Sequence, residues 1–208
     1  MTSISPKTIE RLILYRRILL GINPDDKSHI FSHELARMTG FTAAQIRRDI
    51  MAVGYSGSPV HGYNTQALID GISEFIDAPE VQNVALIGVG HLGRAVLNYF
   101  KGRRPKLAII ASFDNDDTKI NRVIQGCRVL HINSLEKYIK EMNIQVVILT
   151  IPAESAQEIA DRVISAGVKG ILNYAPVKLQ TPPDVYVESR DMIMAVEMAA
   201  YFARQKNE

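Results

Sequence analysis

The segment that most constrains the fold of this chain is a glycine-rich turn between a strand pattern and a helix pattern. Residues 83–87 read Asn-Val-Ala-Leu-Ile, a buried-strand pattern, and Gly-Val-Gly-His-Leu-Gly follows at residues 88–93. An apolar helical pattern then runs to Phe100, and residues 107–113 form a second strand pattern that ends at Asp114. The sequence therefore predicts a complete βαβ unit with parallel strands.

The three glycines have the G-x-G-x-x-G spacing of turns that bind dinucleotides. Gly88 allows the tight turn, Gly90 lets the backbone approach a pyrophosphate, and Gly93 packs the helix on the strand. The helix N-terminus supplies amides and a positive dipole for the anion. Asp114 lies 21 residues beyond Gly93, where it can accept hydrogen bonds from the adenosine ribose and repel a 2′-phosphate. This pattern favours NAD(H) over NADP(H), and the alternative is a turn selected for packing alone.

Strand and helix patterns continue to alternate beyond this unit. Strand patterns cover residues 146–151 and 170–174, and helical patterns cover residues 134–142 and 154–166. This alternation predicts a mostly parallel sheet. The last helical pattern, residues 191–203, is apolar around most of its circumference, which predicts that a partner subunit covers it.

The N-terminal part predicts a small helical module with an excess of positive charge. Helical patterns cover residues 6–20, 32–38 and 42–52, and the glycine-rich segment 54–62 predicts a hairpin. Residues 1–63 hold eight Lys and Arg and five Asp and Glu, a net charge of +3, whereas residues 64–208 hold 16 and 17, a net charge of −1. This is the layout of a winged helix-turn-helix, and the alternative is a packing module with a solvated charged face.

The third predicted helix would be the recognition helix of such a module. Ser5 and Ser32 are expected to cap the first and second helices, and the pattern Thr42-x-x-Gln45 is a capping box for the third. Ile46 and Ile50 are expected to face inward. The side chains expected to be more exposed are Gln45, Arg47, Arg48 and Asp49. Gln and Arg at such positions can reach base edges or phosphates.

Composition excludes several classes of protein. The single cysteine, Cys127, permits neither an intrachain disulfide nor a cysteine-based metal cluster, which suits a reducing cytoplasm. Residues 1–22 mix charged with apolar side chains, so we expect neither a secretory signal nor a membrane partner. The five histidines lack the setting of a proton donor for a dehydrogenase. We therefore expect a cytoplasmic protein that is not an enzyme and binds no metal.

Taken together, these motifs resemble the Rex family, NADH-responsive transcriptional repressors of bacteria, over nearly the whole chain. The segments that carry the resemblance are residues 11–17, 45–50, 62–63, 88–95, 113–114, 166–176 and 187–191.

The resemblance implies an α/β chain in three parts. Residues 1–78 would form a winged helix-turn-helix DNA-binding domain, residues 79–188 a Rossmann-type parallel-sheet domain that binds NAD(H), and residues 189–208 a dimerisation helix exchanged between subunits. The implied function is that of a repressor that senses the NADH/NAD+ ratio. A homodimer, free or bound to NAD+, would hold a palindromic double-stranded operator and release it when NADH binds.

The resemblance also implies roles for individual residues. The implied cofactor-binding residues are Gly88, Val89, Gly90, His91, Leu92, Gly93, Asp114, Thr150, Ile151, Pro152, Asn173, Tyr174 and Pro176. The implied DNA contacts are Thr42, Gln45, Arg47, Arg48, Tyr55, Ser58 and Tyr63. Tyr99 would sense the effector state by bonding Asp191 of the other chain, which otherwise pairs with Arg17. From the residues alone, Tyr99 also fits a helix-core position and Arg17 a solvated one.

The predicted wing departs from the family pattern. Family wings carry Gly-Lys-Arg-Gly before a final Gly-Tyr, whereas residues 57–61 of this chain read Gly-Ser-Pro-Val-His. A wing without Lys or Arg neutralises fewer phosphates, so we expect lower DNA affinity and a smaller salt dependence.

Two other functions stay open on the sequence. One is a Rossmann-type metabolic enzyme that binds NAD or CoA and carries a helical appendage. The other is a transcription factor that responds to a different adenine ligand.

Overall fold

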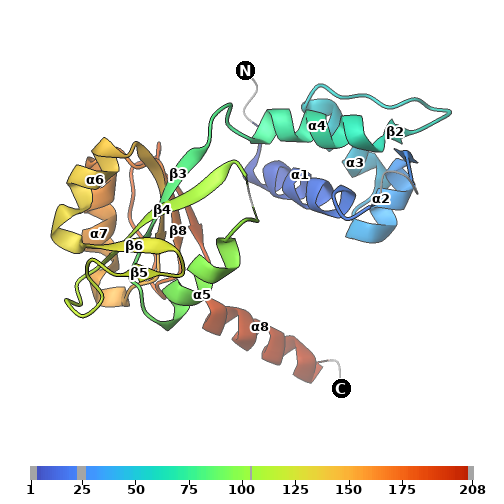
Figure 1. Cartoon of the computed structure of the whole chain (residues 1–208). Coiled ribbons are helices and arrows are strands. Elements are labelled where there is room, and N and C mark those ends of the chain that lie inside the picture. Colours follow the sequence, from blue (N-terminus) through green and yellow to red (C-terminus); the bar gives the residue numbers. More distant parts are fainter. Residues whose placement is uncertain (1–3, 23–26, 104, 206–208) are drawn as a thin grey trace. The chain divides into compact units, whose positions relative to one another are not determined.

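The structure is a computed structural model that describes residues 4–22, 27–103 and 105–205. Its contacts divide the chain into an N-terminal unit, Met1–Pro79, and a C-terminal unit, Glu80–Glu208 (Figure 1). Each unit has its own hydrophobic core, and each is described by itself below.

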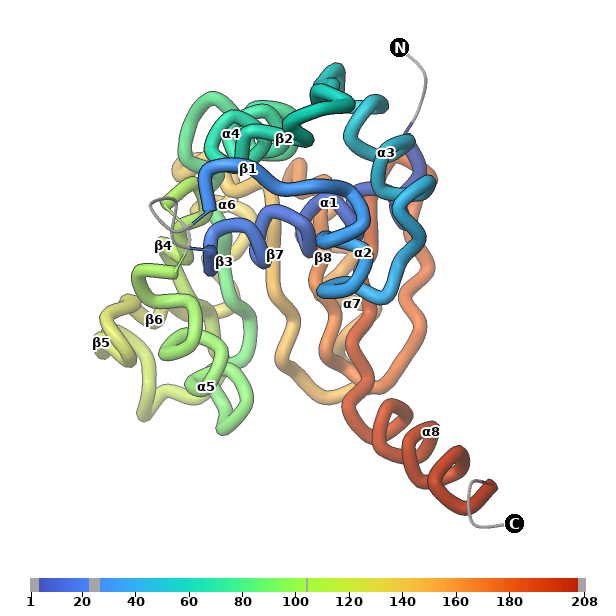
Figure 2. Tube along the Cα trace, turned by 90° about the vertical axis from the view of Figure 1, so that its right-hand side faces the viewer, coloured from blue at the N-terminus to red at the C-terminus, as the bar shows by residue number. Residues whose placement is uncertain are grey.

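The N-terminal unit consists of four helices and a two-stranded antiparallel sheet within its described residues. These elements are α1 (Pro6–Leu19), β1 (His29–Ile30), α2 (Ser32–Thr39), α3 (Ala43–Ala52), β2 (Tyr63–Asn64) and α4 (Thr65–Ile76). α1 packs against α2, α3 and α4, and the two views of Figures 1 and 2 show α4 lying along α1. The core includes Leu12, Tyr15, Leu19, Leu35, Ile46, Ile50, Leu68 and Ile72. The predicted helices are therefore confirmed, with apolar faces that meet in one core.

The caps predicted at Ser5 and Thr42 are confirmed, and the cap predicted at Ser32 is wrong. The Gln45 side chain, which would complete the predicted capping box, bonds to Asp49 and Arg48 instead. Ser5 Oγ accepts a hydrogen bond from the Thr8 amide at 3.2 Å, and Thr42 Oγ1 accepts one from the Gln45 amide at 3.1 Å. The prediction that Ser32 caps α2 is wrong because Ser32 is already the first helical residue. Instead the Glu34 carboxylate reaches back and accepts a hydrogen bond from the Phe31 amide at 2.8 Å, which satisfies that exposed donor.

The predicted hairpin is a short wing. Ser58 and Gly62 exchange both backbone hydrogen bonds at 2.8 Å, which closes its tip. β1 and β2 pair antiparallel at its base, with Ile30 opposite Tyr63. Gly62 has a φ of +73°, and a Cβ there would lie 2.6 Å from the Ile30 carbonyl oxygen, so this turn requires glycine.

The C-terminal unit is built around a seven-stranded sheet with the order β5-β6-β4-β3-β7-β8-β9. Its strands are β3 (Gln82–Ile87), β4 (Leu107–Asp114), β5 (Val123–Ile124), β6 (Cys127–His131), β7 (Ile144–Leu149), β8 (Gly170–Asn173) and β9 (Tyr186–Ser189). All neighbouring pairs are parallel except β5 with β6. Its helices are α5 (His91–Phe100), the short 3-10 helix η1 (Ile132–Ser134), α6 (Leu135–Glu141), α7 (Ala153–Ser165) and α8 (Met192–Gln205). The mostly parallel sheet predicted from the sequence is confirmed.

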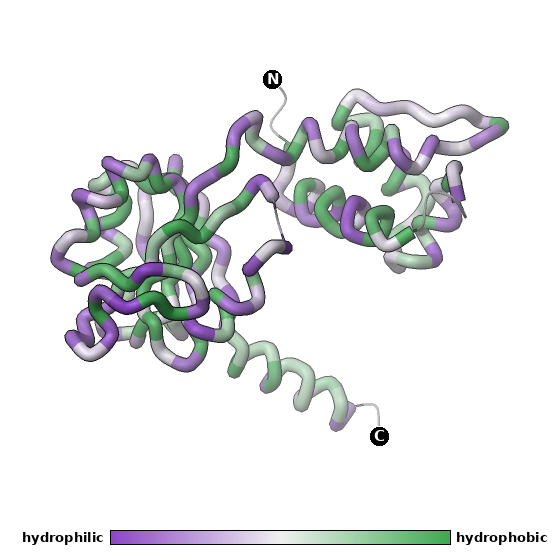
Figure 3. The backbone as a smooth tube through the Cα atoms, viewed as in Figure 1, coloured by the Kyte–Doolittle hydropathy of each residue, from purple (hydrophilic) through white to green (hydrophobic). Residues whose placement is uncertain are grey.

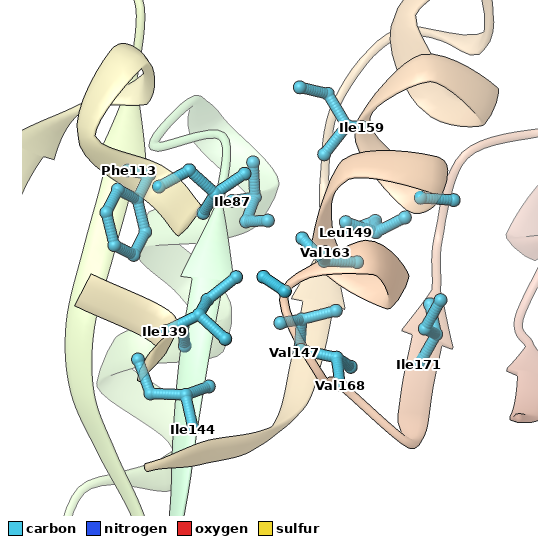
Figure 4. Packing of buried hydrophobic residues seen from close by; sticks show 14 of the residues in the cluster. Ile87, Phe113, Ile139, Ile144, Val147, Leu149, Ile159, Val163, Val168 and Ile171 are labelled. Atoms are coloured by element: carbon cyan, nitrogen blue, oxygen red, sulfur yellow. The ribbon is translucent and has the colours of Figure 1, made fainter. Parts of the chain in front are cut away.

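Helices cover both faces of this sheet. Alternate residues of β3 point to opposite faces, so Ile87 packs with α6 and α7 while Leu86 packs with α5. Figure 4 shows the first core, in which Ile139 of α6 and Val163 of α7 meet strand residues such as Phe113. Burial on both faces explains why the central strands read as continuous apolar runs.

None of the described residues of α8 is buried within the single chain, although the helix is strongly apolar. Figure 3 shows this apolar character along the helix. Its large exposed apolar side chains are Met192, Ile193, Met194, Val196, Met198, Tyr201 and Phe202, each at least 49% exposed. Within the described residues, no helix is both long and apolar enough to cross a membrane.

Candidate dinucleotide site and DNA-binding surface

The three glycines of the turn between β3 and α5 have different physical roles. Gly88 has a φ of +93°, and a Cβ there would lie 2.5 Å from the Thr150 carbonyl oxygen. A Cβ on Gly93 would lie 2.1 Å from the Gly88 carbonyl oxygen, so helix and strand could not approach as they do. Gly90 differs because a Cβ there would meet no atom within 4 Å. The protein does not need glycine at position 90 for its own packing, so the open backbone there fits a ligand.

A cleft of about 440 Å³ lies at the carboxyl ends of β3, β4 and β7. Six of the predicted cofactor residues line it: Gly88, Gly90, Asp114, Thr150, Ile151 and Pro152. The carboxyl edge of a parallel sheet is where such folds bind nucleotides. The turn, the helix N-terminus and the acidic residue are thus brought to one site, as the sequence predicted.

Asp114 is the anionic group of this cleft and is only 7% exposed. Its Oδ2 accepts hydrogen bonds from the Val89 amide at 2.6 Å and from Lys119 Nζ at 3.2 Å, and its Oδ1 accepts one from the Asp116 amide at 2.9 Å. Burial raises the pKa of Asp114, but these hydrogen bonds outweigh burial and hold the pKa below its usual value. The carboxylate therefore stays ionised at neutral pH and can accept hydrogen bonds from ribose hydroxyls.

Thr150 both borders the cleft and supports the turn. Its hydroxyl donates to the Gly88 carbonyl oxygen at 2.6 Å, and its amide donates to the Ile87 carbonyl oxygen at 2.9 Å. These bonds connect the end of β7 to the glycine turn at the end of β3. Thr150 thus shapes the cleft through the backbone as well as lining it.

The other predicted cofactor residues lie outside the lining of the cleft. Val89 and Gly93 are buried, Leu92 is half-buried, and His91 is exposed at the start of α5. The prediction for Asn173 disagrees most with the structure, because this side chain is fully buried.

The side-chain amide of Asn173 forms hydrogen bonds with the loop that follows β8. It donates to the Val177 carbonyl oxygen at 2.8 Å and accepts from the Ala175 amide at 3.0 Å, so it stabilises the loop after β8. Tyr174 is half-buried in the core beside α5, and Pro176 is exposed in the same loop.

Ten residues that line the cleft were not among the predicted cofactor residues: Ile87, Phe113, Asn115, Lys119, Ile132, Asn133, Ser155, Glu158, Ile159 and Arg162. A general signal existed for Ile132 and Asn133, because they directly follow β6 and parallel strands end at the same edge of a sheet. Arg162 comes from the third turn of α7, where Glu136 accepts hydrogen bonds from it at 2.6 and 3.0 Å. Only the packing of α7 brings this residue to the cleft.

α3 presents the charged surface predicted for the recognition helix. Arg47 and Arg48 are exposed, and Gln45 is half-buried. Arg47 Nη1 donates to Ser32 Oγ at 3.0 Å, which holds the guanidinium near the start of α2. Arg48 Nη2 donates to Gln45 Oε1 at 3.0 Å. Gln45 and Arg48, three residues apart, thus lie on one side of this short capped helix, and Arg47 projects from a different side. Both guanidinium groups are exposed and able to contact phosphates and base edges.

The prediction that Asp49 is exposed is wrong. Asp49 is 3% exposed, and Arg11 of α1 makes a bidentate ion pair with it at 2.7 Å for both bonds. The Tyr15 hydroxyl and Gln45 Nε2 also donate to it, at 2.9 and 2.8 Å. Paired donors compensate the cost of burying a carboxylate. Helical spacing could not reveal this burial because Arg11 and Tyr15 lie 38 and 34 residues away along the chain.

The remaining predicted DNA contacts divide between surface and core. Thr42 is exposed as the cap of α3, and Ser58 is exposed at the tip of the wing, where its hydroxyl accepts from the Val60 amide at 3.2 Å. Tyr63 is 6% exposed and lies in the core of the unit, which does not support a direct contact with DNA. Tyr55 is half-buried, with its ring centroid 6.1 Å from that of Tyr63. The two tyrosines support the base of the wing.

Comparison with known proteins agrees with both halves of this description. Residues 3–50 match the family described as "Putative DNA-binding protein N-terminus", and residues 80–177 match the family described as "CoA binding domain". The chain is 38% identical over 201 residues to the redox-sensing transcriptional repressor Rex of Listeria welshimeri, which covers 97% of this chain and 94% of that protein. The chain belongs to the Rex family.

Solved structures of a Rex-family repressor, RSP, are also similar over the whole chain at 30% identity. The structure of RSP with beta-NAD+ and operator DNA has a TM-score of 0.91 and is matched over 95% of its length. The structure of RSP with beta-NADH has a TM-score of 0.86 and is matched over 97% of its length. The fold expected from the resemblance to Rex is therefore confirmed.

Of the three residues that the resemblance to Rex assigns to the switch, Arg17 and Tyr99 are exposed and Asp191 is half-buried. Tyr99 is 62% exposed, which rules out the helix-core alternative, and Arg103 lies over its ring at 4.3 Å from the centroid. Asp191 caps α8 by accepting hydrogen bonds from the Ile193 and Met194 amides at 2.9 and 3.0 Å. Arg17 is exposed on α1. Their pairing between subunits stays a prediction.

We expect Cys127 to take no part in redox sensing. Its side chain is 6% exposed in the core beside α5, and burial raises the pKa of the thiol, which disfavours the reactive thiolate. We predict that Cys127→Ser leaves the NADH concentration for half-maximal operator release unchanged within about twofold. A gel-shift titration with and without mild oxidant measures this. A response to oxidant that disappears in the variant would show that thiol chemistry contributes.

Proposed function

We propose that this chain is a DNA-binding transcriptional repressor that senses the NADH/NAD+ ratio and is not an enzyme. The observation that carries the proposal is that one chain combines an exposed, cationic recognition helix with a cleft whose glycine turn and ionised Asp114 fit NAD(H). Membership in the Rex family supports the same conclusion. The proposed location is the cytoplasm, where operator DNA and NAD(H) meet.

In the proposed mechanism, a homodimer holds a palindromic double-stranded operator when it is free or bound to NAD+. Residues 1–78 of each chain contact DNA, residues 79–188 bind the dinucleotide, and residues 189–208 exchange between subunits. The exposed apolar side chains of α8 support this exchange, because such a surface needs a partner.

NADH binding favours a form of the dimer whose recognition helices no longer match successive major grooves, so DNA is released. In this form Tyr99 bonds Asp191 of the other chain, and Arg17 loses its own bond to that residue. By linkage, operator DNA weakens NADH binding by the same factor by which NADH weakens operator binding. The dinucleotide therefore acts as a signal and is not consumed.

Selection of bound DNA from a random pool, with and without NADH, tests the proposal. The expected result is a palindrome that is enriched without NADH and lost when NADH is added. Steady oxidation of NADH with small carbonyl substrates, or binding of CoA with no effect of NADH, would instead support a metabolic enzyme with a helical appendage.

Arg47→Ala separates DNA binding from dinucleotide binding. We predict that operator affinity falls by about tenfold, because one charged contact to base or phosphate is lost. NADH affinity should stay as in the wild type, since Arg47 lies on α3 and not at the cleft. Fluorescence anisotropy with labelled operator measures the first effect and calorimetry the second. Lys137→Ala, which removes an exposed cation of α6, is the matched control. Equal operator affinity in both variants would refute a recognition role for Arg47.

A further inference from the structure

The buried carboxylate of Asp49 lies directly behind the side of α3 that carries Gln45 and Arg48. Its Oδ2 accepts hydrogen bonds from Arg11 Nε at 2.7 Å and from the Tyr15 hydroxyl at 2.9 Å. Its Oδ1 accepts hydrogen bonds from Arg11 Nη2 at 2.7 Å and from Gln45 Nε2 at 2.8 Å. Each oxygen thus receives two donors, which is the full capacity of a carboxylate.

This saturation determines how the Gln45 side chain is oriented. A carboxylate only accepts hydrogen bonds, so the nitrogen of the Gln45 amide must face Asp49, and the oxygen must face the other way. The oxygen accepts from Arg48 Nη2 at 3.0 Å, which agrees with this orientation. A flipped amide would place its oxygen against the Asp49 carboxylate and its nitrogen against the Arg48 guanidinium. Both contacts are repulsive, so one orientation of the amide is selected.

The ionised form of Asp49 is itself maintained by the same contacts. Burial raises the pKa of Asp49, but the hydrogen bonds from Arg11, Gln45 and Tyr15 outweigh it and hold the pKa below its usual value. Thr8 Oγ1 accepts a further hydrogen bond from Arg11 Nη2 at 3.1 Å, which fixes the guanidinium on α1. A connected set of bonds therefore runs from α1 through Asp49 and Gln45 to Arg48 on the surface.

An amide held in this way can still read a base. A Gln side chain has two donor hydrogens and two acceptor lone pairs, and the bonds to Asp49 and Arg48 use one of each. The remaining donor and acceptor match N7 and the N6 amino group of adenine in the major groove. The orientation of the amide decides whether this pair of bonds can form.

We propose that Asp49 is a positioning residue for base recognition, which fixes the Gln45 amide so that it reads an adenine in each operator half-site. This inference rests on the proposed function, because it assumes that α3 enters the major groove. Asp49 itself stays buried and does not touch DNA. Its effect passes through Gln45, and Arg48 is held in place by the same amide.

The test compares the palindrome selected by the wild type with operators in which each A·T pair is replaced in turn. For the wild type we expect one A·T position per half-site whose replacement weakens binding by about tenfold or more. In Asp49→Asn, which keeps the shape but removes the charge, that penalty should fall to about twofold, as it should in Gln45→Ala. The double variant Gln45→Ala with Asp49→Asn should lose no further discrimination, because both changes remove one interaction.

Tyr15→Phe is the matched control. It removes a donor from Oδ2 of the same carboxylate but leaves the bond between Oδ1 and Gln45 in place. We expect a lower thermal midpoint and an unchanged pattern of base preference. A purely structural role for Asp49 would lower affinity for all operators equally in both variants, and that outcome would overturn the proposal.

A measurement on the wild-type dimer keeps the proposal testable if Asp49→Asn does not fold. The order parameter of the Gln45 side-chain amide, assigned by comparison with Gln45→Ala, should be close to about 0.85, the value of rigid backbone. A value below about 0.6 would show a mobile amide and refute the positioning role. Failure of the wild type to select any palindrome would contradict the proposed function, whereas selection without an effect of Asp49 would contradict this inference alone.

Discussion

The variant Gly90→Ala is expected to bind operator DNA as the wild type does but not to release it when NADH is added. A methyl group at this position meets no protein atom within 4 Å, and its φ of −78° suits any residue, so the fold should be unaffected. The methyl would instead occupy the space in which a pyrophosphate approaches the backbone. Loss of charge-assisted bonds to backbone amides should weaken NADH binding by roughly 100-fold or more. Calorimetry measures NADH binding, and a gel shift across NADH concentrations measures release.

The neighbouring glycine provides the contrast. A Cβ at Gly88 would lie 2.5 Å from the Thr150 carbonyl oxygen, so Gly88→Ala should lower the thermal midpoint, whereas Gly90→Ala should not. If Gly90→Ala still releases the operator at the NADH concentrations that release the wild type, the turn is structural and the dinucleotide binds elsewhere.

The variant Asp114→Ala is expected to lose affinity for NADH by about 10- to 100-fold, because hydrogen bonds between a carboxylate and the ribose are lost. Affinity for NADPH should fall less, since the wild-type carboxylate already repels a 2′-phosphate. Removal of Asp114 also takes away one of the two carboxylates that pair with Lys119 at 3.2 Å, so this cation attracts the 2′-phosphate more strongly. Titration of both dinucleotides with the wild type and the variant shows whether the affinity for NADH falls by a larger factor than the affinity for NADPH.

Asp116→Ala is the control for this change. Asp116 is the second carboxylate that pairs with Lys119, also at 3.2 Å, and its side chain is 39% exposed. This variant removes one negative charge near the cleft but keeps the buried acceptor of Asp114. Equal losses of NADH and NADPH affinity in Asp114→Ala would place the carboxylate outside the ribose subsite.

The local elements of this protein were largely predictable from its sequence. The glycine turn, the strands on either side of α5 and the first three helices all carry strong local signals, because periodicity and caps act over a few residues. Asp114 and the glycines could also be identified as site residues from the sequence. They follow strands of one sheet, and parallel strands end at a common edge.

The errors arose where a residue's environment is made by distant parts of the chain. Asp49 looked solvent-exposed, but it is buried against Arg11 and Tyr15 of α1. Asn173 is a different case: the ligand contact implied for it stays a prediction, and its buried amide bonds to Ala175 and Val177 of the loop that directly follows β8. Tyr63 ends the wing motif, but its ring fills the core.

The sequence by itself determined the N-terminal helices, the βαβ unit and the position of the glycine turn, since all of these depend on short-range patterns of apolar residues, glycines and caps. Tertiary structure decided which polar side chains are available to contact a ligand or DNA and which are buried and bonded within the protein. A buried carboxylate such as Asp49 is stable only where several hydrogen-bond donors surround it. Arg162 lines the cleft only because α7 packs against the sheet in a position that places it there. Such convergence is a property of packing, which no local pattern encodes.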